Sequence, residues 1–136
     1  MFLIDTVVIS ELRKSRPSAT AVQWFRRQRD SDLFLSVVTL GEIERGIEKK
    51  RRTDPAFSAE LSVWLESLVN VYGDRVLPVS QAVARRWGRL SAQYGNESVD
   101  LLIAATALTH GLAVVTRNVS DFAIIDVGVI DPYTFS

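Results

Sequence analysis

Hydrophobic positions gather in five short runs, separated by longer segments of mixed character. A run that is apolar at nearly every position predicts a strand buried on both faces. Pro78 interrupts the third run, so that strand should be short or lie at an edge of its sheet. The runs lie within residues 2–5, 33–38, 75–79, 112–116 and 123–130.

The segments between these runs repeat their apolar residues at helical spacing. The predicted helices are a short one ending by residue 16, then residues 18–29, 39–50 and 55–72, and two more opened by Ser80 and Ser98. Residues 117–121 are expected to form a loop. Four aromatic residues at helical positions could serve the core or an interface, with the core as the default: Trp24, Phe25, Trp64 and Trp87. Strands alternating with helices predict a three-layer α/β/α fold with a mainly parallel sheet of about five strands.

Composition narrows the chemistry that this chain can perform. With 136 residues, it is expected to form a single domain over residues 1–136. It has no cysteine and one histidine, His110, which excludes disulfide scaffolds, thiolate zinc sites and multi-histidine zinc sites. We also expect no signal peptide, no membrane span and a cytoplasmic location. If the protein is an enzyme, carboxylates must carry much of its chemistry, together with a hard metal ion.

Four acids fall at equivalent places in the predicted topology. Asp5 ends the first strand, and Glu42 and Asp100 lie in the first turns of two helices. Asp121 follows the fourth strand. Parallel sheets carry their sites at the carboxyl ends of the strands, so these acids should share one edge. The hydroxyls of Thr6 and Thr116 and the amide of Asn118 are expected there too. Like charges held close together favour a bound cation, for which Mg²⁺ or Mn²⁺ suits oxygen ligands.

Each acid also has an ordinary structural explanation. Asp5 could be a helix N-cap or a turn residue, and Asp100 an acid near a helix N-terminus. Glu42 completes a capping box with Thr39, and Asp121 could form an Asx-turn. Two other aspartate chemistries are disfavoured. Dehalogenase-type phosphatases need Asp-x-Asp after the first strand, and receiver domains need a lysine after a late strand.

Three blocks of sequence resemble the PIN-domain nucleases, and among them the VapC toxins of the FitB-like group. These blocks are LIDTVVISELRK, SVVTLGEIERGIEK and VDLLIAATALTHGLAVVTRNVSDF. The resemblance implies a Mg²⁺- or Mn²⁺-dependent endoribonuclease that acts as the toxin of a type II toxin–antitoxin pair. It places the family's metal-site acids on Asp5, Glu42, Asp100 and Asp121, supported by Thr116 and Asn118. The family usually reads Asp-Thr-Asn at its first motif, whereas this chain has Val7 in place of the asparagine, which could reduce activity.

The resemblance also implies partners. These are an RNA substrate, a cognate VapB- or FitA-like antitoxin, and a second copy of the chain in a homodimer that joins a larger assembly with antitoxin. Thirteen arginines stand against three lysines, and most arginine clusters are expected on solvated helix faces. Arg117, next to the acids in sequence, is the candidate for holding the RNA backbone. Two alternatives stay open: a PIN-like module that binds RNA or protein without catalysis, and a DNA-directed metal nuclease.

Overall fold

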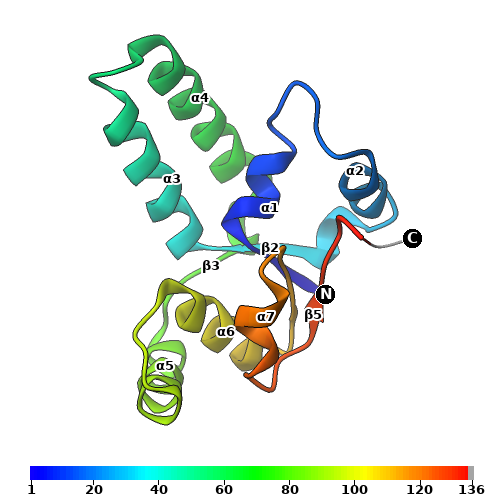
Figure 1. Cartoon of the computed structure of the whole chain (residues 1–136), viewed down its shortest axis with the longest axis vertical. Helices are drawn as coiled ribbons and strands as arrows, with labels where there is room; N and C mark the ends of the chain where they lie inside the picture. Colours follow the sequence, from blue (N-terminus) through cyan, green and yellow to red (C-terminus); the bar gives the residue numbers. More distant parts are fainter. Residues whose placement is uncertain (135–136) are drawn as a thin grey trace.

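A central sheet of five parallel strands organises residues 1–134, the part of the chain that the computed structural model describes (Figure 1). The strand order is β3-β2-β1-β4-β5. The strands are β1 (Phe2–Ile4), β2 (Leu33–Ser36), β3 (Val76–Leu77), β4 (Ala113–Val115) and β5 (Val129–Ile130). All four pairings are parallel, as predicted, and β3 lies at an edge, as Pro78 indicated.

Helices cover both faces of the sheet (Figure 1). One face carries α1 (Thr6–Glu11), α2 (Ala19–Arg26), α3 (Val37–Lys50) and α4 (Pro55–Tyr72). The other carries α5 (Gln81–Tyr94), α6 (Val99–His110) and α7 (Val119–Ala123). The predicted three-layer α/β/α fold is therefore confirmed. None of the helices within residues 1–134 is long and apolar enough to cross a membrane.

Two hydrophobic cores lie on the two sides of the sheet. Successive side chains of a strand point to opposite faces, so Leu3 belongs to one core and Ile4 to the other. Both side chains are completely buried, which makes each face of β1 a packing surface. Of the aromatic residues predicted to be core, Trp24 is buried, while Phe25, Trp64 and Trp87 are half-buried and pack against the cores.

Polar side chains fix most helix starts. The Ser18, Asp54 and Ser80 side chains accept hydrogen bonds from backbone N–H groups in the first turns of α2, α4 and α5. Ser98 precedes α6 as expected, but its side chain makes no capping bond. Gly111 ends α6 with φ 68°, a left-handed conformation that favours glycine.

Several boundaries differ from the sequence prediction: β2 ends at Ser36 and not at Val38, and α2 ends at Arg26 and not at Arg29. Two further differences bear on the site. Helix α3 begins at Val37, two residues early, because the Ser36 side chain caps it by accepting a 3.0 Å bond from the Val38 N–H. Thr39 is therefore inside the helix, and the predicted Thr39–Glu42 capping box is wrong. Residues 117–121 are not all loop either, since α7 starts at Val119 and fully buries the Phe122 side chain in the second core.

Candidate functional site

Asp5 is held at the junction between β1 and α1. Its Oδ1 accepts a 2.8 Å bond from the Thr6 N–H, so Asp5 is the N-cap of α1, one of the alternatives that the sequence left open. Its Oδ2 accepts a 2.9 Å bond from the Thr116 hydroxyl. The two residues meet because β1 and β4 pair with Ile4 beside Val115. Asp5 is 5% exposed, so both bonds offset the cost of burying its carboxylate.

Thr6 joins this junction to α3. Its hydroxyl donates a 2.5 Å bond to Glu42 Oε1 and lies 3.0 Å from the Thr39 hydroxyl oxygen. A hydroxyl has only one proton, so when Thr6 donates to Glu42, the buried Thr39 hydroxyl can donate to Thr6. Because α3 begins at the carboxyl end of β2, Glu42 reaches the same sheet edge as Asp5.

Asp100 and Asp121 face a shared hollow on the other side of this edge. Asp100 is in the first turn of α6 and Asp121 in the first turn of α7, which begins after β4. Both line a cavity of about 340 Å³, with Asn96, Ser98 and Ser120 among its polar neighbours. The dipole of α6 favours the negative charge of Asp100 at the amino end of that helix.

The four acids influence one another electrostatically. Burial raises the pKa of Asp100, and the negative charges of Asp5, Asp121 and Glu42 raise it further. Burial also raises the pKa of Asp5 and the Glu42 charge adds to this, while the hydrogen bonds from Thr116 and Thr6 lower it. The predicted convergence at one edge is thus seen in the structure, and a cation at this edge would relieve the repulsion.

The donor chemistry of this edge suits a hard cation. All four acids offer carboxylate oxygens, the ligands that Mg²⁺ and Mn²⁺ prefer. His110 is exposed at the opposite end of α6 and cannot join them. No group of three or more His, Cys, Asp or Glu side chains within residues 1–134 is arranged to hold a metal ion. The acids therefore lie at one edge of the sheet and affect each other's charge, but they are not arranged as a complete set of metal ligands. Their assignment as metal ligands stays a prediction.

The remaining predicted site residues lie around the end of β4. The Asn118 N–H donates a 3.0 Å bond to the Thr116 hydroxyl oxygen, which orients that hydroxyl toward Asp5. The Asn118 side chain is exposed and does not cap α7, so its supporting role stays a prediction. Arg117 is exposed, and its guanidinium carbon lies 4.4 Å from the ring centroid of Tyr133. Val7 is 48% exposed in the first turn of α1.

A second hollow adjoins the acids between α1, α3 and α4. It measures about 270 Å³ and is lined by Thr6 and Glu42 together with Arg13, Phe57 and Trp64. The Arg13 guanidinium carbon lies 5.1 Å from the Phe57 ring centroid and 5.8 Å from that of Trp64. Arg13 is therefore half-buried between aromatic rings, unlike the solvated arginine that its sequence cluster indicated.

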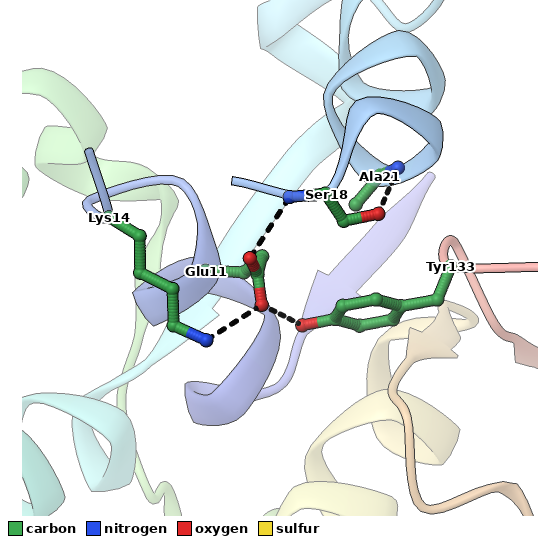
Figure 2. Close-up of polar contacts among 5 residues, drawn as sticks. All are labelled: Glu11, Lys14, Ser18, Ala21 and Tyr133. Carbon is green, nitrogen blue, oxygen red and sulfur yellow. Dashed lines mark hydrogen bonds and ion pairs between the residues drawn. The ribbon is translucent and has the colours of Figure 1, made fainter. Parts of the chain in front are cut away.

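Sequence reasoning missed a buried carboxylate at the end of α1. Glu11 is 6% exposed and accepts three hydrogen bonds, from Lys14 Nζ at 3.1 Å, the Ser18 N–H at 3.0 Å and the Tyr133 hydroxyl at 3.1 Å (Figure 2). The bond to Lys14, followed by that to Ser18, lowers the pKa of Glu11. The only signal in the sequence was its spacing of three from Val8, which places it on the buried side of α1.

Known proteins resemble this chain over nearly its full length. VapC ribonuclease Y4jK of Sinorhizobium fredii is 33% identical, and the match covers 98% of each chain. Toxin FitB of Neisseria gonorrhoeae is 32% identical, over 98% of this chain and 99% of FitB. These matches confirm the resemblance to VapC and FitB that the sequence blocks indicated.

Solved structures give the same result in three dimensions. The crystal structure of FitAcB from Neisseria gonorrhoeae contains a chain that is 32% identical, with a TM-score of 0.83 over 99% of this chain and 100% of that one. A structure of FitAB bound to the IR36 DNA fragment gives a TM-score of 0.86 at 30% identity, over 100% and 98% of the two chains. The sequence model of the PIN domain family matches residues 2–127, a span that includes all four acids. By its strands, its site and these matches, the chain belongs to the PIN-domain family.

Proposed function

We propose that this protein is the toxin of a type II toxin–antitoxin pair and an endoribonuclease that hydrolyses RNA phosphodiester bonds with Mg²⁺ or Mn²⁺. The observation that carries the proposal is the convergence of four carboxylates from distant segments, expressed in the raised pKa of Asp100. The similarity to VapC ribonuclease Y4jK and toxin FitB supports the same activity.

The proposed metal site consists of Asp5, Asp100, Asp121 and Glu42. When bound, the ion supplies a water of lowered pKa and stabilises charge on the scissile phosphate. Thr116 and the Thr6 N–H hold the two oxygens of Asp5 in place. The Thr6 hydroxyl fixes one oxygen of Glu42 and leaves its other oxygen available. Such supporting hydrogen bonds orient carboxylates for a metal ion and raise its affinity.

The proposed partner is an antitoxin. FitB-like chains at 30% and 32% identity occur in structures of FitAB and FitAcB, the first of them bound to DNA. By analogy with those pairs, this chain would join an antitoxin of the VapB or FitA kind. Single-stranded or looped RNA is the proposed substrate, because its bases are open to recognition. The predicted homodimer and cytoplasmic location remain part of this proposal.

The test is cleavage of a structured RNA pool, with Mn²⁺ or with EDTA, by antitoxin-free protein. We expect cutting by the wild type with Mn²⁺, none with EDTA, and none by Asp100→Ala. A matched control is Asp74→Ala, which removes an exposed acid next to the amino end of β3, at the opposite edge of the sheet. It should cut like the wild type. Cutting by Asp100→Ala at the wild-type rate would remove Asp100 from the site.

Two further arms separate the alternatives. A DNA pool of matched sequence distinguishes a ribonuclease from a DNA-directed nuclease, and we expect only RNA to be cut. Val7→Asn restores the family's usual first motif and should increase the rate if Val7 weakens the site. An absence of cutting by both the wild type and Val7→Asn, from folded protein, would favour the binding module.

A further inference from the structure

We propose that Tyr133 is a positioning residue that holds the Arg117 guanidinium at the rim of the acidic edge, where Arg117 binds a backbone phosphate of RNA, and that Glu11 fixes Tyr133 in this role. The inference rests on the proposed ribonuclease function and adds two residues to its substrate-binding apparatus. Neither Glu11 nor Tyr133 has a part in the proposed metal site.

The strand pairing brings Arg117 and Tyr133 together. Strands β4 and β5 are parallel neighbours with Val115 beside Ile130, and the Thr116 N–H donates a 2.9 Å bond to the Ile130 carbonyl. The segments that follow these strands therefore leave the sheet side by side, at its carboxyl edge. Arg117 is the next residue after Thr116, whose hydroxyl bonds Asp5, so its backbone leaves β4 close to Asp5.

The guanidinium of Arg117 stacks on the Tyr133 ring at 4.4 Å. Within residues 1–134, Arg117 forms no ion pair, so its charge is available to a ligand. An arginine that is already ordered loses less conformational freedom on binding than one free in solvent. Its planar fork also matches a phosphate bidentately. Tyr133 thus prepares Arg117 for a phosphate next to the acids.

Glu11 fixes the other end of Tyr133 (Figure 2). Its Oε1 accepts the Tyr133 hydroxyl at 3.1 Å, while Lys14 and the Ser18 N–H hold the same carboxylate. The Tyr133 N–H also donates to Asp131 Oδ1 at 2.9 Å. Burial and the bond to Glu11 raise the pKa of Tyr133 to about 12, so its hydroxyl stays protonated and donates throughout the neutral range. The tyrosine is therefore anchored at its backbone and at its hydroxyl.

The test measures binding of a fluorescent single-stranded RNA in EDTA at several salt concentrations. Cleavage plays no part in this readout, so it decides the inference separately from the ribonuclease activity. We expect Arg117→Gln to weaken binding about tenfold and to reduce the slope of log affinity against log salt by roughly 0.7, the value for one phosphate contact. Arg29→Gln, which removes an exposed arginine before β2 at the opposite edge, should bind like the wild type.

Variants of Tyr133 test the positioning role itself. Tyr133→Leu should weaken binding in the wild-type background but have no further effect in Arg117→Gln. Tyr133→Phe keeps the ring but loses the bond to Glu11, so its RNA affinity should lie between those of the wild type and Tyr133→Leu. Arg117→Lys keeps the charge without the stacking plane, so it should also bind more weakly, and it serves even if Tyr133→Leu fails to fold.

Three results would overturn the inference. One is wild-type affinity and salt slope in Tyr133→Leu or in Arg117→Lys, which would make the stack a structural contact only. Another is a loss of RNA affinity from Tyr133→Leu that is equal in the wild-type and in the Arg117→Gln background. The third is wild-type protein that shows no salt-dependent RNA binding. If Mn²⁺-dependent cleavage persists in any of these cases, the proposed function stands and only the role of Tyr133 falls.

Discussion

Asp100 carries a charge that the folded protein disfavours. Burial and three neighbouring acids raise its pKa, so above that pKa the ionised side chain reduces the free energy of unfolding of the metal-free protein. We predict that Asp100→Asn raises the melting temperature in EDTA at pH 8. The gain should not exceed about 1 kcal/mol, or about 3 °C, because this half-buried side chain is partly screened by solvent.

The stability difference between Asp100→Asn and the wild type should depend on pH. As pH falls through the raised pKa of Asp100, the wild type takes up a proton and recovers stability, so its deficit against Asp100→Asn should shrink. Glu11 acts in the opposite direction, because its pKa is lowered and its contribution is lost as pH falls through that lowered value. Glu11 is common to both proteins, so their difference isolates Asp100. A lower melting temperature for Asp100→Asn at pH 8 would contradict the predicted repulsion.

The sequence indicated the acids but not the contacts between distant residues. Asp5, Glu42, Asp100 and Asp121 could be placed because each follows or precedes a strand in a predictable way. The bond between Glu11 and Tyr133 could not, since it joins residues 122 apart and depends on how the chain after β5 returns to α1. Local patterns carry no information on such a contact.

The junctions between strands and helices hold the side chains of the site in place. Thr116 follows β4, is fully buried, and donates its hydroxyl to Asp5 at the start of α1. We predict that Thr116→Val, which removes the hydroxyl but keeps the shape, reduces Mn²⁺ affinity or RNA cleavage about 10- to 100-fold. It should also raise the pKa of Asp5 further, because the Thr116 bond lowers it.

Two substitutions serve as controls for the effect of Thr116→Val on metal binding. Thr116→Ser keeps the donor and should retain most of the metal affinity. Thr106→Val removes another buried hydroxyl, one that bonds only the Leu102 carbonyl within α6. It should leave metal binding unchanged. Calorimetric titration with Mn²⁺ measures all three, and equal affinities for Thr116→Val and Thr106→Val would exclude Thr116 from the metal site.

Element boundaries were harder to predict than elements. The start of α3 was placed at Thr39 because Thr-x-x-Glu fits a capping box, yet Ser36 was an equally good cap two residues before. Packing decides between them: Thr39 is buried and bonded to Thr6, so it is needed inside the helix. Helix α7 was missed because its five residues are too few for a periodic pattern.

Over the whole molecule, the strand order determines where the site lies. The chain passes from β1 to β2 on one side and pairs β1 with β4 on the other, so the crevice opens at the carboxyl end of β1. Five parallel strands could be predicted because nearly continuous apolar runs are typical of such sheets. Their order could not, since short apolar runs look alike and pair according to the packing of the helices between them.

The site exists only when the whole chain is folded, because its acids come from four segments between residues 5 and 121. A metal ion that binds all four therefore binds the native state and not the unfolded chain. We predict that Mn²⁺ raises the melting temperature, with a stabilisation of about 2.7 kcal/mol when the ion is at 100 times its dissociation constant.

This rise in melting temperature with Mn²⁺ should be lost in Asp100→Asn, which removes a proposed ligand. It should be kept in Asp74→Asn, at the amino end of β3. Sodium chloride at matched ionic strength controls for screening, which alone weakens the repulsion among the acids. An equal shift with Mn²⁺ and with sodium chloride would show that the ion only screens these charges. An Mn²⁺-specific shift that survives in Asp100→Asn would place the ion elsewhere on the molecule. An Mn²⁺-specific shift that needs Asp100 would support a metal site at the carboxyl ends of β1 and β4.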